Sequence, residues 1–312
     1  MAPRPPFSVQ RKSMTKLPLA TPTNPSQGVT SGTNNVTQPR HPHRLCALVA
    51  IGAAISDVVA TAADEAGTRQ AISSISVVGT RFEVTTGDGH IVPQDDLVGA
   101  ILTLGHGHDR VPLRIDAVDT DPRNPDGAIM LYTMSTRDAA TGEWRNICEP
   151  DAEGRRMGFP LAGTWTQDGR HLPSDTAFSI TCTGGAQAKC ARFGYRPWEK
   201  LPDGTPLWDH HQACTRMIRA DYCGDGVGHT RNGTPIVIYD RNGIQQDEAA
   251  PGMAFEAAWG VDGALCVSRT RIPDVLTMEG LTAICPGVRQ LPQAAACESH
   301  AGALILNRSI EP

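Results

Sequence analysis

The chain has 312 residues, of which 40% are hydrophobic and 20% are charged, a composition too apolar for a protein that is disordered throughout. Of its 28 basic and 33 acidic residues, six basic and one acidic lie in the first 62 positions, so residues 63–312 carry 22 basic and 32 acidic residues and a formal net charge of −10. A folded part of that sign lacks the basic surface that binds phosphate backbones, which excludes nucleic acid as a partner.

Residues 1–44 are rich in Pro, Thr and Ser and show no apolar periodicity, so we expect a disordered leader. Residues 45–62 then give an apolar run after a basic residue, with small residues up to Ala62, as is typical of a secretory signal peptide cleaved near that position. The alternatives are a buried helix or an uncleaved signal anchor, the only membrane attachment that we consider, but Asp57 interrupts a run shorter than the roughly 20 residues that span a bilayer. We therefore predict export of residues 63–312 as a single domain, to the periplasm, the outer surface or the medium.

Cleavage would remove Cys46 and leave eight of the nine cysteines, and an even number behind an export signal is typical of a disulfide framework. A structural zinc site is the alternative, but no two cysteines stand in C-x2-C or C-x4-C spacing. A second alternative is two or three disulfides together with free thiols. The connectivity stays open because eight cysteines allow about 100 pairings. We predict four disulfides among Cys148, Cys182, Cys190, Cys214, Cys223, Cys266, Cys285 and Cys297.

From residue 75 onward, short runs of β-branched and apolar residues alternate with Gly, Asp and Pro turns. Runs of this length predict an antiparallel sheet or barrel. Asp88-Gly89 and Asp168-Gly169 favour tight hairpin turns. We expect strands within residues 75–86, 97–105, 112–118, 128–134, 163–172 and 177–183.

One main helix is expected over about residues 205–223. Thr205 can cap it, and Pro206 suits the first helical position. Gly224 would terminate it. Apolar and cysteine side chains recur at helical spacing, so we expect Cys214 and Cys223 to tie this helix to neighbouring strands; the stripe consists of Leu207, His211, Cys214, Ile218 and Tyr222.

After this helix, residues 234–240 predict a strand that enters a hairpin at Asn242-Gly243. Val261-Asp262-Gly263 predicts a second hairpin turn, residues 274–285 a shorter helix, and residues 301–308 a last strand. The fold class is therefore α+β, mostly antiparallel strand with one main cysteine-anchored helix, and disulfide-rich.

The Gly-rich loop after Cys223 holds the best candidates for chemistry. Asp221, Asp225 and His229 could converge there as candidate catalytic residues. A more specific hypothesis is catalysis by a thiol nucleophile at Cys223, but cysteines of an exported protein are usually oxidised. A divalent metal held by Asp221, Asp225 and Asp240 is a further alternative, although the loop lacks EF-hand spacing.

A structural role is the competing interpretation of Asp221, which could cap backbone amides or pair with Arg216 or Arg219. His106 and His108 could share one face of a strand and chelate a metal, whereas adjacent histidines on a helix, as at positions 210 and 211, point to different faces. Polar loop residues remain the simpler interpretation. The sequence predicts no metal site and no cofactor.

An aromatic cluster is expected near Cys190 and Cys214. Its side chains could stack on a sugar or a peptide, but packing in the core is the favoured interpretation. The chain has no G-x-S-x-G, H-E-x-x-H, Walker or Rossmann motif. The members of the aromatic cluster are Phe193, Tyr195, Trp198 and Trp208.

Three segments carry a resemblance to a known family: FSITCTGGAQAKCARFGYRPW, HQACTRMIRADYCGDGVGHTRNGTPIVIYD and FEAAWGVDGALCVSRTRI. They are similar to the ADYC domain, named after the tetrapeptide that stands here at residues 220–223. The likeness covers about residues 75–290. It implies a bacterial exported protein, often myxobacterial, and it transfers no catalytic residues because the family has none assigned.

Three functions follow as hypotheses. The favoured one is a disulfide-stabilised binding or structural module of the bacterial cell envelope or exterior, with a cell-surface polymer or a protein as its ligand. The alternative is an extracytoplasmic, hydrolase-like enzyme that uses Asp221, Asp225 and His229. A calcium-stabilised adhesin is a third.

Overall fold

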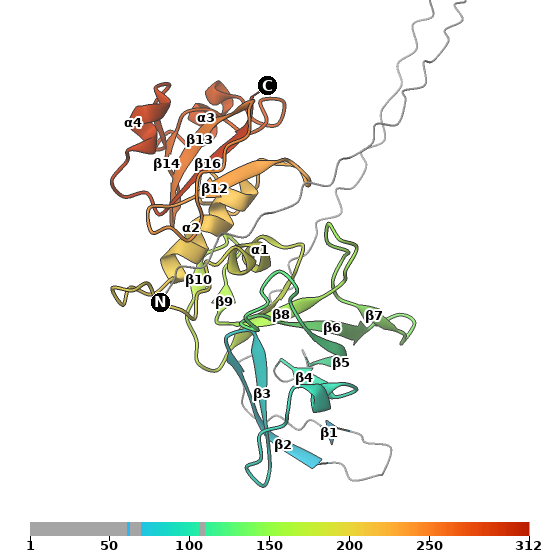
Figure 1. Ribbon diagram of the computed structural model, residues 1–312. Coiled ribbons are helices and arrows are strands. Elements are labelled where there is room, and N and C mark those ends of the chain that lie inside the picture. The colour runs from blue at the N-terminus through green and yellow to red at the C-terminus, as the bar shows by residue number, and fades with distance from the viewer. Residues whose placement is uncertain (1–60, 63–69, 106–109, 312) are drawn as a thin grey trace, which may run out of the picture. The chain divides into compact units, whose positions relative to one another are not determined.

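The computed structural model describes residues 61–62, 70–105 and 110–311, all of which fall within one compact unit (Figure 1). These residues form a nine-stranded sheet, a five-stranded sheet, a two-stranded hairpin and four α-helices. The predicted α+β class, mostly antiparallel and disulfide-rich, is confirmed.

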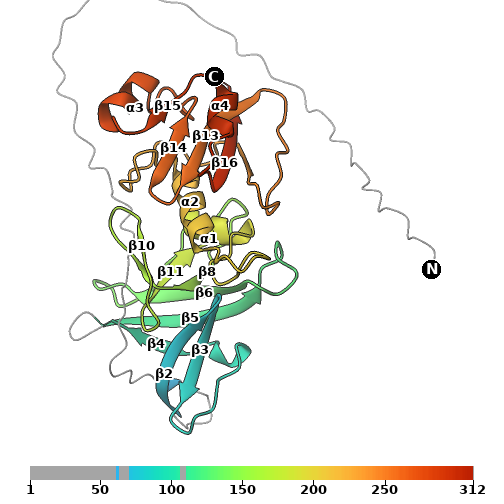
Figure 2. The same cartoon turned by 90° about the vertical axis from the view of Figure 1, so that its left-hand side faces the viewer.

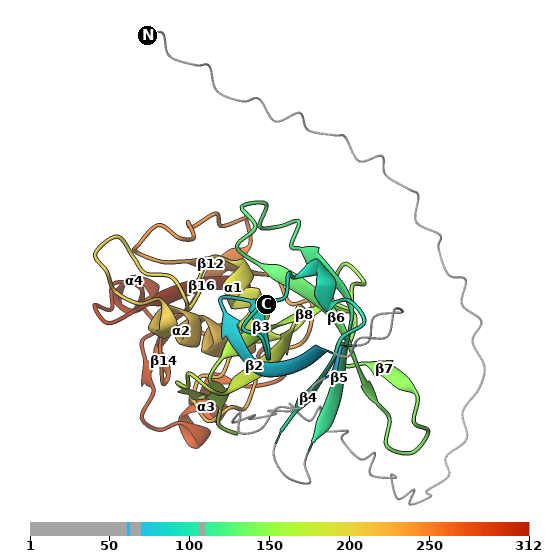
Figure 3. The same ribbon diagram turned by 90° about the horizontal axis from the view of Figure 1, so that it is seen from below.

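The nine-stranded sheet has the order β11-β8-β6-β5-β4-β1-β2-β3, with β7 paired to β6, and all of its pairs are antiparallel. The sheet bends so that β2 and β3 also contact β8, as seen in the view from below (Figure 3). Its strands are β1 (Thr61–Ala62), β2 (Gln70–Val78), β3 (Arg81–Thr86), β4 (Ile101–Leu104), β5 (Val111–Thr120), β6 (Met130–Arg137), β7 (Trp144–Asn146), β8 (Gly158–Ala162) and β11 (Phe178–Cys182).

The bend encloses the first hydrophobic core. Alternate residues of each strand point inward because successive side chains of a strand face opposite sides of the sheet. A 3-10 turn, η1 (Asp95–Leu97), adds the buried Leu97. Fully buried members of this core include Phe82, Leu102, Ile115, Leu131 and Phe159.

The five-stranded sheet has the order β12-β16-β13-β14-β15, in which only β14 and β15 run parallel. Strand β13 contacts two helices, α2 (Trp208–Arg219) and α4 (Ala294–Glu298). The strands are β12 (Ile236–Tyr239), β13 (Met253–Gly260), β14 (Gly263–Val267), β15 (Arg289–Gln290) and β16 (Ile305–Ile310), and the separate hairpin consists of β9 (Thr164–Trp165) and β10 (His171–Leu172).

The helices are α1 (Ala186–Arg192), α2 (Trp208–Arg219), α3 (Met278–Ile284) and α4 (Ala294–Glu298). Figure 2 shows α1 and α2 between the strands of the two large sheets. Contacts agree with this view, because α1 packs on α2 and β11 while α2 packs on β13, β14 and β16. The longest helix therefore belongs to the interior, where all but two of the residues from His210 to Arg219 are buried.

The predicted bounds of the main helix, residues 205–223, are too wide. Thr205 does not cap it: its carbonyl accepts the N–H of Leu201, while Pro206 forms an extended bridge with Lys200, so the chain becomes helical only at Trp208.

The helix also ends before the predicted terminator, Gly224. Ala220 adopts a left-handed conformation with φ 50°. The N–H of Asp221 donates to the carbonyl of Arg216, and that of Ala220 to Met217, which is the Schellman pattern with Ala in the position that Gly usually takes.

The hairpin predicted at Asn242-Gly243 is wrong. A turn forms there around the side chain of Asp240, but β12 pairs with β16 and not with the next strand, because β16 inserts between β12 and β13. The predicted turns at Asp88-Gly89, at Asp168-Gly169 and after Gly260 are confirmed.

Candidate functional site

The three candidate catalytic residues follow α2 in one loop, yet each has its own contacts. Asp221 is fully buried. Asp225 is exposed and accepts the backbone N–H of Val227 at 2.9 Å. The half-buried ring of His229 stacks against Tyr222 with 6.2 Å between ring centroids. The catalytic role of these residues stays a prediction, and in this geometry each side chain has a local structural partner.

Asp221 forms a buried ion pair with Arg216. Its Oδ2 lies 2.7 Å from Nη1 of Arg216 and accepts the N–H of Gly226 at 3.0 Å, and the two side chains are 0% and 2% exposed. Burial raises the pKa of Asp221 above its ordinary value, and the Arg216 guanidinium opposes that shift. These are the contacts that the structural interpretation of Asp221 requires.

Arg216 connects three loops. Besides Asp221, its guanidinium donates to the carbonyl of Asp168 in the β9–β10 turn and to the carbonyl of Val261 in the β13–β14 turn. Gly226 lies against the first of these turns, where an added Cβ would be 2.9 Å from Cα of Asp168. The loop that holds the candidate catalytic residues is thus packed against the β9–β10 and β13–β14 turns.

Tyr222 belongs to a second buried network. Its hydroxyl donates to Oε1 of Glu256 at 3.0 Å and accepts the backbone N–H of Arg271 at 2.8 Å. Arg271 in turn forms a two-pronged ion pair with Glu256, through Nε and Nη2 at 3.0 Å each. Burial and the negative charge of Glu256 raise the pKa of Tyr222 well above its usual range, so its hydroxyl stays protonated.

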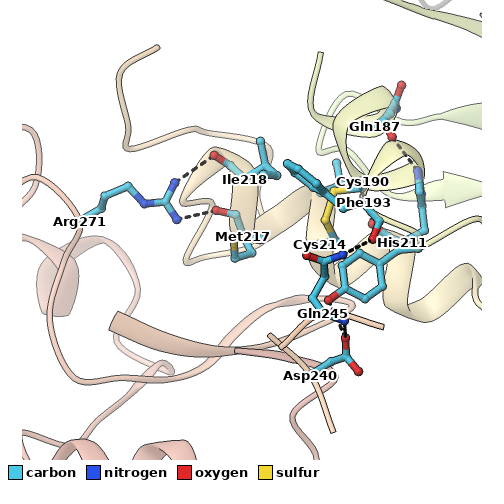
Figure 4. Close-up of a disulfide and its surroundings, with 12 residues drawn as sticks. Gln187, Cys190, Phe193, His211, Cys214, Met217, Ile218, Asp240, Gln245 and Arg271 are labelled. Carbon is cyan, nitrogen blue, oxygen red and sulfur yellow. Dashed lines mark hydrogen bonds between the residues drawn. A yellow bond between two sulfur atoms is a disulfide. The ribbon is translucent and has the colours of Figure 1, made fainter. Parts of the chain in front are cut away.

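The same arginine caps α2. Nη1 of Arg271 donates to the carbonyl of Ile218 at 3.0 Å and Nη2 to that of Met217 at 2.7 Å, as Figure 4 shows. A cation at the carboxyl end of a helix is stabilised by the partial negative charge of its free carbonyl groups. Sequence reasoning missed this network, although Glu256 among the apolar residues of β13 was a signal, because a charge in a buried strand needs a partner.

The eight cysteines beyond residue 147 form four disulfides. The expectation that Cys214 and Cys223 tie α2 to strands is wrong, because Cys214 pairs with α1 (Figure 4) and Cys223 pairs with the residue that follows α3. Disulfides therefore tie α2 and the loop after it to α1 and to the end of α3, where strands were expected. The pairs are Cys148–Cys182, Cys190–Cys214, Cys223–Cys285 and Cys266–Cys297.

His210 and His211 contact different partners, as expected for adjacent helical positions. Nε2 of His210 lies 2.8 Å from Nδ2 of Asn242, and Nε2 of His211 lies 3.0 Å from the carbonyl of Gln187 (Figure 4). Burial lowers the pKa of His211 to about 4. His106 and His108 lie outside the described residues, and within the described ranges no three His, Cys, Asp or Glu side chains gather as metal ligands would.

The predicted aromatic cluster is divided between two cores. Trp198 and Trp208 pack against the core of the nine-stranded sheet, while Phe193 and the fully buried Tyr195 belong to the core between α2 and the five-stranded sheet. Trp208 instead stacks on His171, with ring centroids 3.7 Å apart. The packing interpretation therefore describes these side chains.

A third buried ion pair lies at the end of α1. Arg192 donates to Asp121 through Nε at 2.7 Å and Nη2 at 3.1 Å, and these side chains are 3% and 0% exposed. Burial alone would raise the pKa of Asp121, but the hydrogen bonds and charge of Arg192 lower it overall. This pair was not predicted, since its partners are 71 residues apart.

A small hollow of about 140 Å³ lies between β2 and the loop that precedes β11. Ligand pockets of proteins usually measure roughly 300–1,000 Å³, so this hollow admits no more than a small group. Its lining residues are Ile75, Ser76, Val77, Ala162, Ser174, Asp175, Thr176, Ala177 and Phe178.

Among the residues that the structure describes, no helix has the length and apolar content to cross a bilayer. The disulfides indicate an oxidising, extracytoplasmic environment.

Taken with the sheets and the buried ion pairs, the four disulfides define a disulfide-stabilised α+β module. No curated protein and no solved structure matches the chain. The model of the ADYC domain matches residues 94–273, more than half of the sequence, and the chain belongs to the ADYC domain family.

Proposed function

We propose that the chain is an exported bacterial module with a binding or structural role in the cell envelope or exterior, where its ligand is a cell-surface polymer or a protein. The observation that carries this proposal is the pairing of all eight cysteines beyond residue 147. Such a framework persists only where thiols are oxidised, which is outside the reducing cytosol of most bacteria.

The proposed leader adds a second argument. Residues 45–62 have the order of a signal peptide, with cleavage near Ala62. Cleavage there would remove β1, whose ladder consists of Thr61 with Ala71 and Ile101, and Ala62 with Gln70. The mature domain would lose only the bridges of this two-residue strand, but β1 joins β4 to β2, so β2 and β3 would then contact the rest of the sheet through β8.

The test is to express the full chain with its own leader in a bacterium, fractionate the cells and alkylate free thiols before digestion without reductant. We expect a mature amino terminus just after Ala62 and the four disulfide-linked peptide pairs in the extracytoplasmic or medium fraction. An Ala62→Phe variant is the matched control, because a bulky residue at the cleavage position should retain a precursor that still contains Cys46. Free thiols among the eight cysteines, or retention of the wild-type chain in the cytosol, would refute the proposal.

A further inference from the structure

The four disulfides differ in how far their cysteine residues are exposed to solvent. Cys190, Cys214, Cys266 and Cys297 are all 0% exposed. Cys223 is half-buried, and its partner Cys285 is 6% exposed. Thiol–disulfide exchange needs access for the attacking thiolate, and the Cys223–Cys285 pair has a partly exposed residue whereas two of the other pairs are fully buried.

The Cys148–Cys182 bond is the fair comparison, because Cys182 is also half-buried. Its surroundings are tighter, since Cys182 pairs with Gly158 across the β8–β11 ladder and the sulfur of Cys148 lies beneath that glycine, 3.2 Å from where a Cβ would stand. Breaking this bond would leave Cys182 paired in the β8–β11 ladder and Cys148 two residues after β7, which pairs with β6. It releases no segment.

The segment closed by Cys223–Cys285 is held much more loosely. We define the flap as residues 272–288, from the residue after the buried Arg271 to the residue before β15. It contains α3, in which Leu281 is the only buried residue, while Val275 and Ile284 are 37% and 51% exposed. Local openings of a fold involve such segments, which have few buried contacts.

We propose that Cys223–Cys285 is a redox latch: a partner protein with two neighbouring thiols reduces this disulfide selectively and frees the flap, while the other three disulfides stay closed. This inference rests on the proposed export, because the latch must first be oxidised. The released flap uncovers the apolar surface on which Leu276, Met278 and Leu281 now pack.

The exchange balances without a further reactant. One thiolate of the partner attacks the sulfur of Cys223, a mixed disulfide forms, and the Cys223–Cys285 bond breaks to release Cys285 as a thiolate, which takes a proton. The second thiol of the partner then attacks its own sulfur in the mixed disulfide. The products are free thiols on Cys223 and Cys285 and one disulfide in the partner, which is oxidised by the two electrons that reduce the latch.

Dithiothreitol, a dithiol, serves as the probe. The oxidised protein is incubated with graded concentrations of it, quenched with N-ethylmaleimide and mapped by mass spectrometry for the label at each cysteine. We expect Cys223 and Cys285 to be labelled at least about tenfold faster than any of the other six. Earlier labelling of another pair, or simultaneous opening of all four, would overturn the latch. Thiols that are free before dithiothreitol is added would instead refute the proposed function, so the two failures are distinguishable.

Hydrogen exchange gives the conformational readout. After selective reduction and alkylation, amide exchange should rise in residues 272–288 and in the loop after Cys223, with β5 and β6 unchanged. A double variant, Cys223→Ser with Cys285→Ser, should reproduce this pattern, and Cys148→Ser with Cys182→Ser should not. If the double variant fails to fold, the labelling order of the wild-type chain still decides the case. Selective reduction with no added exchange in the flap would also overturn the proposal.

Discussion

Removal of one hydroxyl group tests the buried network around Tyr222. The Tyr222→Phe substitution keeps the ring in its buried position, where Tyr222 is 1% exposed and its ring stacks on Trp259 at 5.2 Å between centroids. It removes two hydrogen bonds, one to Glu256 and one from the backbone of Arg271. No cavity larger than an oxygen atom is created, so the effect reports on the hydrogen bonds.

The expected cost follows from what is left behind. The N–H of Arg271 loses a buried acceptor, which costs about 1–3 kcal/mol. Glu256 keeps the donors of Arg271 and of Asn307, so its loss adds about 1 kcal/mol. We therefore expect the free energy of unfolding to fall by about 2–4 kcal/mol.

Tyr195→Phe is the matched control. Tyr195 is equally buried, but its hydroxyl makes a single hydrogen bond, to Asp240 at 2.8 Å, and Asp240 keeps the backbone N–H groups of Asn242, Ile244 and Gln245. We expect a loss of about 1 kcal/mol. Guanidinium unfolding without reductant, with the disulfides intact, measures both changes. If Tyr222→Phe costs no more than Tyr195→Phe, the network does not contribute as argued.

Three further outcomes are expected. Burial lowers the pKa of His211 from 6.5 to about 4, so the fold favours the neutral imidazole, and the free energy of unfolding should fall by about 3 kcal/mol as pH decreases from 7 to 4. Urea unfolding across this range should show a shallower decline for His211→Gln than for the wild-type chain. Parallel curves for the two proteins would contradict the assignment. All four tyrosines have raised pKa values, mainly because of burial, so the protein should lose stability as pH rises above about 10, the pKa of tyrosine in the unfolded chain. Tyrosinate absorbance at 295 nm should then appear only when the protein unfolds. A gradual titration near pH 10 in the folded protein would contradict this prediction. Gly224→Ala should lower stability, measured by thermal unfolding, by more than about 3 kcal/mol, because the residue has a positive φ and its added Cβ would overlap the carbonyl of Asp262. The control Gly233→Ala has a similar φ of 83° but open space around it, so it should cost about 1 kcal/mol. Equal effects would show that the contact of Gly224 with Asp262 does not determine the cost.

Turns and strand segments could be predicted because their signals are local. Asp168-Gly169 favours a tight turn whatever surrounds it, and that turn closes β9 onto β10. Asn242-Gly243 carries an equally good signal but joins strands that do not pair, since β16, more than 60 residues later, takes the edge of β12. Strand order depends on such distant pairings, and no local pattern contains them.

The helices show a second limit of sequence reasoning. The stripe along α2 was visible because twelve residues give three turns of periodicity. The seven residues of α1 and the five of α4 are too short for such a pattern, although both are rich in alanine, a strong helix former.

At the candidate site, the sequence could suggest that Asp221 has a charged partner but could not choose between Arg216 and Arg219. The choice depends on the left-handed turn at Ala220, which reverses the chain and returns the carboxylate to α2. The disulfide pairing depends likewise on the tertiary arrangement, because Cys223 and Cys285 are separated by 62 residues.

Every member of the tetrapeptide at residues 220–223 has a distinct internal contact: a helix stop, an ion pair, a shared hydroxyl and a covalent cross-link. Its side chains are consequently engaged with the chain itself. The same tetrapeptide in a protein of another organism would therefore indicate the fold around it. A search for the ligand of that protein would begin on surfaces away from the tetrapeptide.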